Sequence, residues 1–279
     1  MSLDTKIVAS KRRLELAFAG VVSLALIVLI VAVMELSKPP SSDGSVAEVS
    51  GPIVVFPDFA SISDIEEKKQ QFFDFFQDYV RYENDLISET RIRLLDYAEL
   101  VDDGVPLSVL ERGWVVELAQ AYEVETQLAS DRDLVDELLL RVDVIPASLV
   151  LAQAANESAW GTSRFALEGN NIFGQWCFEE GCGIVPNRRV QGATHEVKSF
   201  DSIKASIEGY FRNINTHHLY VDFRAERARL RQLGHRLDPI ALVEGLERYS
   251  QRGENYIDEV QTLIQQNDLR QRDRRLLEN

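Results

Sequence analysis

The sequence predicts a mainly α-helical protein with one small β-hairpin, an N-terminal transmembrane helix and a helical accessory region ahead of a second helical domain. Three observations support this fold class. Residues 16–34 form an uninterrupted apolar run of 19 residues, close to the roughly 20 that span a bilayer. Apolar residues recur at helical spacing through most of the remaining chain. Residues 170–200 differ, because they combine short β-compatible runs with glycines, Pro186 and both cysteines.

The N-terminus predicts a single membrane anchor. Residues 1–15 carry Lys11, Arg12 and Arg13 directly before the apolar run, and such a basic flank favours a cytoplasmic N-terminus. We expect residues 16–36 to cross the membrane and the rest of the chain to lie outside the cytoplasm. The alternative is a cleaved signal peptide. Against it, the apolar run exceeds the usual signal-peptide core, and no A-x-A cleavage site follows.

A linker and an acidic region follow the anchor. Residues 37–56 are rich in Ser, Pro and Gly, which predicts a flexible linker. The negative charge of the chain, −15 in total, is concentrated in residues 41–145, which carry 8 Lys/Arg and 24 Asp/Glu. The chain has no basic patch of the kind that phosphate backbones require, and this excludes nucleic acid as a partner.

Residues 57–139 are predicted to form an acidic helical region. Ser108 and Glu111 have the spacing of a capping box at the start of its second helix. The apolar stripes predict which faces point inward. These are Phe72, Phe75, Phe76, Tyr79 and Val80 in the first helix, Leu110, Trp114, Leu118 and Tyr122 in the second, and Leu134, Leu138 and Val142 in the third.

Residues 140–268 are predicted to form the second domain, and 269–279 a C-terminal tail. Its first helix begins at Pro146, which suits a first helical turn, and stops at Gly161. Asp238 followed by Pro239 is typical of a later helix start, and we expect that helix to end at Gly253. The inward positions of the later helices are Ile203, Ile207, Phe211, Ile214, Leu242, Leu246, Tyr249, Tyr256, Val260 and Leu263.

The two cysteines, Cys177 and Cys182, lie in the run WCFEEGCG. In an exported chain the oxidising compartment favours a disulfide between them. The alternative, half of a zinc site, needs two further ligands, and the four histidines of the chain show no metal-binding spacing. We therefore expect neither a metal nor a cofactor.

Glu157 is the candidate catalytic residue that the sequence singles out. It follows the run LVLAQAAN, whose small and apolar residues predict a buried helix end, and Trp160 lies one turn further on as an apolar wall. Desolvation of this kind raises a carboxyl pKa, as a general acid at neutral pH requires. The alternative is a solvated glutamate at a helix end without a catalytic role.

The run AQAANESAWGTSRFA, followed by GNNIFGQW, resembles the glucosaminidase domain of bacterial peptidoglycan hydrolases, glycoside hydrolase family 73. Within that family the chain is similar to the Bax-type proteins of Gram-negative bacteria. The resemblance covers about residues 140–268, and FPDFASISDIEEKKQ is also Bax-like. It implies a lysozyme-like fold and an endo-β-N-acetylglucosaminidase activity on the glycan strands of peptidoglycan. Together with the predicted anchor, this leads us to expect an inner-membrane protein with a periplasmic catalytic domain.

The resemblance also implies roles for individual residues. Glu157 matches the catalytic acid, which protonates the glycosidic oxygen. Tyr249 and Tyr256 match tyrosines beside the acid that orient a water or the substrate N-acetyl group; the alternative is two tyrosines that only fill the core. Contacts with substrate are implied for Trp160, Asn171, Phe173, Gly174, Tyr249 and Tyr256.

The chain departs from the family pattern at the second carboxylate. Many members place a glutamate in the hairpin after the Asn-Phe-Gly turn, but the stretch GIVPNRRVQGATHEV has no acid in its first strand. Glu179 and Glu180 come earlier and Glu196 later, and we favour Glu180 over Glu196. Inversion needs a partner carboxylate about 6.5–9.5 Å away and retention one at about 5–5.5 Å. Without one, the substrate's N-acetyl oxygen is the alternative nucleophile.

Two other functions fit the same pattern. A lysozyme or lytic transglycosylase of the same fold would cut the neighbouring glycosidic bond. A cell-wall-binding scaffold would use the acidic helices to recruit partners and would have no activity.

Overall fold

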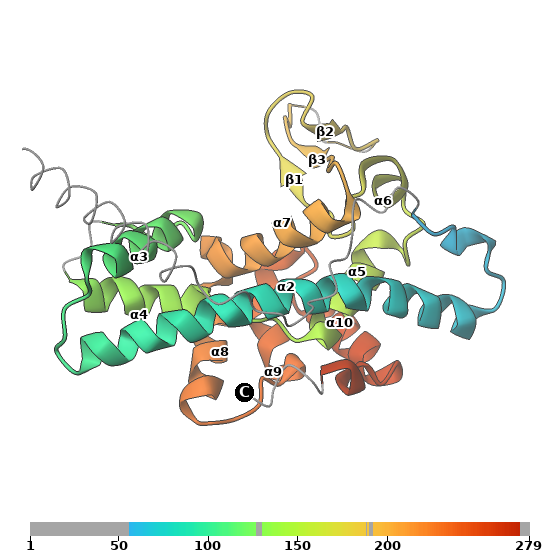
Figure 1. The fold of residues 1–279 in the computed structure, drawn as a ribbon. Helices are drawn as coiled ribbons and strands as arrows, with labels where there is room; N and C mark the ends of the chain where they lie inside the picture. Colours follow the sequence, from blue (N-terminus) through green and yellow to red (C-terminus); the bar gives the residue numbers. More distant parts are fainter. Residues whose placement is uncertain (1–55, 127–129, 188, 190–191, 274–279) are drawn as a thin grey trace, which may run out of the picture. The chain divides into compact units, whose positions relative to one another are not determined.

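The computed structural model describes residues 56–126, 130–187, 189 and 192–273 as helices that enclose one core, together with a small antiparallel sheet (Figure 1). In chain order the elements are η1 (Phe59–Ser61), α2 (Ile65–Asp102), α3 (Val109–Ala121), α4 (Asp131–Arg141), α5 (Ala147–Ser158), α6 (Arg164–Gly169), β1 (Trp176–Cys177), β2 (Gly183–Ile184), β3 (Glu196–Lys198), α7 (Ile203–Thr216), η2 (His218–Tyr220), α8 (Val221–Gln232), α9 (Pro239–Val243), η3 (Glu244–Tyr249), α10 (Glu254–Gln266) and η4 (Leu269–Asp273). The mainly helical class is confirmed.

The predicted anchor at residues 16–36 lies outside the described residues, as does the linker apart from its last residue. Among the helices that the structure describes, none combines the length and the apolar character needed to cross a membrane.

Helix α2 is the first long element of the described chain. It begins at Asp64, whose side chain accepts a hydrogen bond from the Glu67 N–H. Its predicted inward face is buried except for Phe75, which is half-buried. Along its length α2 packs against α4, α5 and α7 (Figure 1). The predicted accessory region and the predicted catalytic region therefore share one core.

Helix α3 begins with the predicted capping box, in which Ser108 and Glu111 each accept a hydrogen bond from the other's backbone N–H. The predicted inward face of this helix is only partly confirmed, because Trp114, Leu118 and Tyr122 are half-buried. Leu110 is 85 % exposed, whereas Val115 and Ala119 are fully buried. The physical reason is that α3 packs mainly against the single helix α4, so only a narrow strip is covered.

A buried ion network fixes the segment that enters α5. The Asp143 carboxylate, on the α4–α5 connection, lies 2.9 Å from Arg231, 3.6 Å from Arg91 and 3.9 Å from Arg227. Burial alone would raise the pKa of Asp143, but Arg227, Arg91 and Arg231 hold the pKa below its usual range. Because Arg91 belongs to α2 and Arg227 and Arg231 to α8, one carboxylate joins three parts of the fold.

Helix α5 is capped from the other end of the chain. Pro146 is its N-cap and offers no side-chain hydrogen bond. Instead, the Asp273 carboxylate accepts from the Ser148 backbone N–H at 2.8 Å and from the Ser148 hydroxyl at 2.6 Å. Residue 273 lies in the stretch that the sequence suggests is a tail, yet 269–273 form η4 and pack along α5.

The C-terminal end of α5 differs from the prediction by two residues. The helix ends at Ser158, because Ala159 and Trp160 take left-handed backbone conformations with φ of 51° and 59°. Gly161 follows with φ of 74°, and a Cβ there would lie 2.6 Å from the Phe59 ring. Only glycine fits this close approach between the end of α5 and η1.

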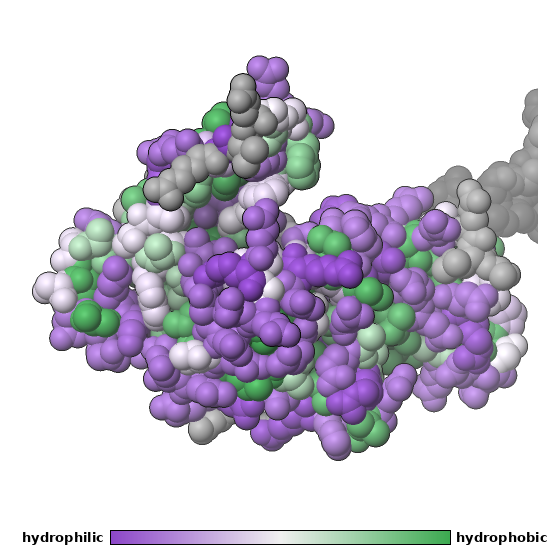
Figure 2. Space-filling model, turned by 180° about the vertical axis from the view of Figure 1, so that it is seen from behind, coloured by the Kyte–Doolittle hydropathy of each residue, from purple (hydrophilic) through white to green (hydrophobic). Residues whose placement is uncertain are grey.

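The predicted hairpin is a three-stranded antiparallel sheet in the order β1-β3-β2, because β3 pairs on both edges. Val197 of β3 lies opposite Trp176 on one side and Ile184 on the other. Cys177 and Cys182 form a disulfide with an S–S distance of 1.98 Å. In space-filling view the sheet region projects from the helical body (Figure 2).

The later helices follow the predicted pattern with one shift. Asp238 caps α9 and Pro239 occupies its first position, as predicted. This helix ends at Val243 and continues as η3 to Tyr249, so the predicted end at Gly253 is late. Gly253 is instead the N-cap of α10.

Glu83 of α2 predicts a pH dependence of stability. It is 9 % exposed, and burial, followed by repulsion from Glu208, raises its pKa to about 7, while Lys204 opposes the shift. The folded state thus holds a proton that the unfolded chain releases near pH 4.5. We expect this one group to lower the free energy of unfolding by about 2 kcal/mol as the pH rises from 4.5 to 7, after allowance for screening by solvent.

Glu83→Gln is expected to remove this loss, and urea denaturation at pH 5 and pH 8 measures it. Glu89→Gln, at an exposed position of the same helix, is the matched control. Equal pH dependence in wild type and Glu83→Gln would refute the assignment.

Candidate active site

Glu157 lies in the last turn of α5, where its carboxyl is half-buried. The Tyr256 hydroxyl donates a hydrogen bond to it, and the Asn156 amide lies 3.4 Å from Oε1. Gly174 approaches from the other side, since a Cβ built on it would lie 3.5 Å from Glu157 Oε2. Helix α5, helix α10 and the turn before β1 therefore meet at this carboxyl.

The surroundings favour the protonated form of Glu157. Burial is the largest influence and raises its pKa above the usual glutamate range. The Arg252 charge, the Tyr256 hydrogen bond and the Asn156 hydrogen bond each lower the pKa, and the Glu259 charge raises it. The net effect is a pKa raised above its ordinary value, as the sequence predicts for a general acid.

A directed chain of hydrogen bonds ends on Glu157. The Tyr210 hydroxyl donates to Gln153 Oε1, and Gln153 Nε2 donates to the Tyr256 hydroxyl at 2.6 Å. The Tyr256 hydroxyl in turn donates a hydrogen bond to the Glu157 carboxyl. Tyr210, Gln153 and Tyr256 are fully buried, so this chain orients the acid from inside the core.

Tyr249 supports the site through two neighbours, Phe173 and Tyr256. Its hydroxyl donates to the Phe173 carbonyl at 2.9 Å, and its ring stacks on Tyr256 with centroids 5.6 Å apart and an interplanar angle of 7°. Of the two tyrosines that the resemblance implies, Tyr256 contacts the acid and Tyr249 holds the turn opposite it.

The turn at residues 171–174 is fixed by its own side chains. Asn171 is buried and donates to the carbonyls of Gln175 at 2.9 Å and Lys198 at 2.7 Å. The Phe173 ring stacks on Tyr210 with centroids 4.1 Å apart. Gly174 takes φ of 64°, a left-handed conformation that favours glycine. Asn171 and Phe173 thus build the turn, while Gly174 faces the acid.

Trp160 is expected to form an apolar wall beside Glu157, but the ring contacts that the structure gives for it are with other residues. Its ring packs edge-on against Phe72 and Phe73 of α2, with centroids 5.5 and 5.3 Å apart. The left-handed conformations of Ala159 and Trp160 turn the indole toward α2. Trp160 also lines a groove between α5 and α10.

The candidate second carboxylates lie on the sheet region. Glu196 is buried, and its two oxygens accept the backbone N–H groups of Gly181 at 3.1 Å and Gly183 at 2.8 Å. These bonds lower the pKa of Glu196. Glu179 and Glu180 are exposed in the loop that the disulfide closes. None of the three is among the groups that contact Glu157 or shift its pKa.

Sequence reasoning missed four residues around the acid. Gln153 and Tyr210 carry the hydrogen-bond chain described above. Arg252 lies 5.5 Å above the Tyr256 ring and forms an ion pair with Glu259. Arg252 and Glu259 are seven positions apart around the start of α10, and no local pattern marks such a pair as part of a site.

The Tyr256 hydroxyl predicts a change in the pH profile. Because its hydrogen bond stabilises the charged form of Glu157, Tyr256→Phe is expected to raise the acid's pKa. The alkaline limb of kcat/KM would then move to higher pH, with kcat reduced about tenfold. Tyr82→Phe, on α2, is the control. An unmoved alkaline limb in Tyr256→Phe would contradict this contact.

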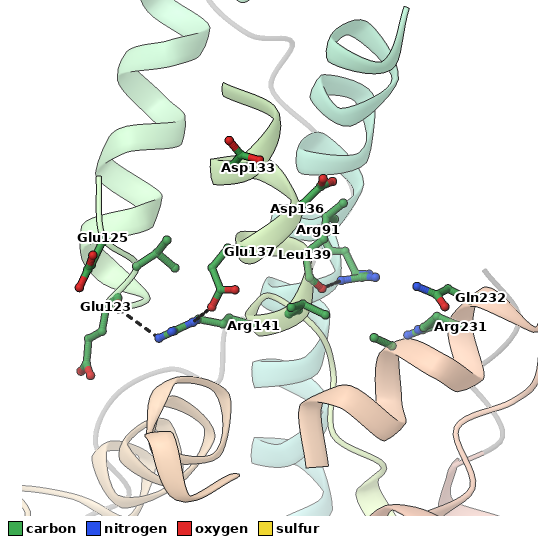
Figure 3. A pocket seen from close by; sticks show the side chains of 13 residues that line it. Arg91, Glu123, Glu125, Asp133, Asp136, Glu137, Leu139, Arg141, Arg231 and Gln232 are labelled. Carbon is green, nitrogen blue, oxygen red and sulfur yellow. Dashed lines mark hydrogen bonds and ion pairs between the residues drawn. The ribbon is translucent and has the colours of Figure 1, made fainter. Parts of the chain in front are cut away.

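A larger cavity, of about 830 Å³, lies elsewhere, between α2, α4 and α8 (Figure 3). Arg141 crosses part of it, bonded to Glu137 and to the Glu123 carbonyl. No residue that lines it contacts Glu157. The described residues also hold no cluster of three His, Cys, Asp or Glu side chains that could bind a metal.

Comparison with known proteins places this site in a family context. Residues 133–269 match the glucosaminidase family model, described as mannosyl-glycoprotein endo-beta-N-acetylglucosaminidase. Protein bax of Escherichia coli K12 is 36 % identical over 160 residues, which cover 57 % of this chain and 57 % of that protein. The chain therefore spans little more than half the length of this relative.

A solved structure was also found. The catalytic domain of the autolysin Auto from Listeria monocytogenes aligns with 78 % of this chain and 99 % of its own, at 16 % identity and a TM-score of 0.39. The family match includes Glu157, the turn at residues 171–174, Tyr249 and Tyr256. Residues 133–269 of this chain, just under half of it, thus match the glucosaminidase family model.

Proposed function

We propose that this chain is a peptidoglycan hydrolase that cleaves the β-1,4 bond after N-acetylglucosamine, with Glu157 as general acid. One observation carries the proposal: a half-buried glutamate of raised pKa lies between Tyr256 and Gly174 in a glucosaminidase domain. A carboxyl with a raised pKa holds its proton to higher pH than an ordinary glutamate does, and in that form it can protonate a glycosidic oxygen.

The surroundings of Glu157 suit both halves of the proton transfer. Burial favours the neutral acid before the reaction. After transfer the carboxylate must be stabilised, and Tyr256 donates a hydrogen bond to it while Arg252 supplies a nearby positive charge. The buried Gln153 and Tyr210 hold Tyr256 in place, so the donor needs little reorganisation during the reaction.

We keep Glu180 as the proposed second carboxylate. Glu196 is less suited, because both its oxygens already accept backbone hydrogen bonds inside the sheet region. The alternative is attack by the substrate's own N-acetyl oxygen, which needs no second carboxylate. A Glu180→Gln variant that keeps its activity would favour the N-acetyl group.

The lysozyme-like fold, the single-pass anchor in the bacterial inner membrane and the periplasmic location belong to the same proposal. They rest on the family resemblance, the apolar run at residues 16–34 with its basic flank, and the Cys177–Cys182 disulfide, which suits an oxidising compartment.

Mass spectrometry of digested peptidoglycan tests the bond specificity. We expect fragments with N-acetylglucosamine at the reducing end. Muramic acid at that end, or its anhydro form, would instead identify a lysozyme or a lytic transglycosylase. Binding to intact glycan without any turnover would identify a scaffold.

A further inference from the structure

A groove of about 510 Å³ lies between the end of α5 and α10, next to the acid but separate from it. It is lined by Ala155, Asn156, Ala159, Trp160, Asp258, Glu259, Thr262 and Leu263. Its volume is in the range of small-ligand sites.

The groove adjoins Glu157 through two of its lining residues. Asn156 directly precedes Glu157, and its amide lies 3.4 Å from the Glu157 carboxyl. Glu259 forms an ion pair with Arg252, whose guanidinium lies over the ring of Tyr256, the residue that donates to Glu157. A polymer that enters the active site could therefore continue into the groove.

The lining matches the chemistry of a sugar ring. Trp160 is half-buried and held by edge-on contacts with Phe72 and Phe73, which fix the orientation of the indole. An indole face suits the apolar C–H face of a pyranose, and it loses little entropy on binding because it is already held. The Asn156 amide and the Thr262 hydroxyl add hydrogen-bonding groups beside it.

The charges of the groove select against an anionic ligand. Asp258 and Glu259 stand at its α10 side, Glu259 in its ion pair with Arg252, so Asp258 is the carboxylate there for which the described residues give no ion pair. Asp258 also lines a neighbouring hollow of about 280 Å³ together with Glu244, Glu247 and Glu254. Carboxylates accept hydrogen bonds from sugar hydroxyls, but they repel the carboxylates of a peptide stem.

We propose that this groove is a saccharide subsite that binds an uncharged N-acetylhexosamine ring, without its peptide stem, beside the bond that is cleaved. The proposal rests on the proposed function, since it assumes that a glycan strand occupies the cleft at Glu157. The occupant is a further ring of that same strand.

The test measures binding without turnover. In a Glu157→Gln background, titration calorimetry with a hexamer of β-1,4-linked N-acetylglucosamine gives the affinity directly. Thr262→Arg, which fills the groove from an exposed position of α10, is expected to weaken binding about tenfold. Gln265→Arg, on the same helix outside the groove, is the matched control and is expected to bind as the parent does.

Equal affinity for Thr262→Arg and Gln265→Arg would overturn the subsite. Tighter binding of a stem-peptide-bearing glycan than of the peptide-free hexamer would overturn the choice of ligand. Failure of the proposed function is a separate result: the wild-type protein would then release no fragments from peptidoglycan, whatever Thr262→Arg does to binding.

Discussion

Glu157→Gln is expected to lower kcat on peptidoglycan by about 10³-fold and to leave the fold intact. The amide keeps the shape of the carboxyl and can still accept the hydrogen bond from Tyr256, but it cannot donate a proton to the glycosidic oxygen. Because burial raises the pKa of this carboxyl, the substitution also removes an unfavourable buried acid, so Tm is expected to stay the same or to rise. Release of soluble fragments and a thermal melt measure the two effects.

Glu168→Gln is the matched control, since Glu168 is exposed on α6, eleven residues further along the chain. It is expected to keep full activity. Full activity in Glu157→Gln would instead end the assignment of the acid.

Asp143→Asn is expected to cost about 3–5 kcal/mol of unfolding free energy, the largest effect on stability that we predict. The buried carboxylate lies within 4 Å of Arg91, Arg227 and Arg231, and Arg227 is 1 % exposed. Without the negative charge, three guanidinium groups remain close together and partly desolvated. Urea denaturation at neutral pH gives the difference.

Asp136→Asn, at an exposed position of α4, is the control and is expected to change stability by less than about 0.5 kcal/mol. A loss of similar size in both variants would show that Asp143 has no special place in the fold. Since the network holds the segment that enters α5, Asp143→Asn is also expected to lower activity at temperatures where the control stays active.

The helices were largely predictable from the sequence because their apolar faces are set by local spacing. The inward faces of α2, α4 and α7 follow the pattern closely. Helix α3 does not, because the depth of burial depends on how many neighbours a helix has, and spacing carries no such information. Nor did the sequence indicate that Asp273 caps α5, because Asp273 and its partner Ser148 are 125 residues apart.

The site was predictable only in part. Glu157 and Gly174 carry the family motif and meet in space, as expected. In the sequence Gln153 is not distinguished from the small and apolar residues around it in α5, although it connects two buried tyrosine hydroxyls. Glu196 illustrates the opposite case: its position in a strand after the motif suggested catalysis, whereas its oxygens bind backbone N–H groups. Hydrogen-bond partners across the fold decide such roles, and sequence spacing does not reveal them.

The proposed role of Glu157 as general acid requires surroundings that raise the pKa of its carboxyl. Its most direct test is carboxyl ¹³C NMR of glutamate-labelled protein, with Glu157→Gln to identify the signal of Glu157. We predict a titration midpoint clearly above the ordinary glutamate value of 4.5. A midpoint at or below that value would contradict the account, because the carboxyl would then have lost its proton at the pH where it must donate it.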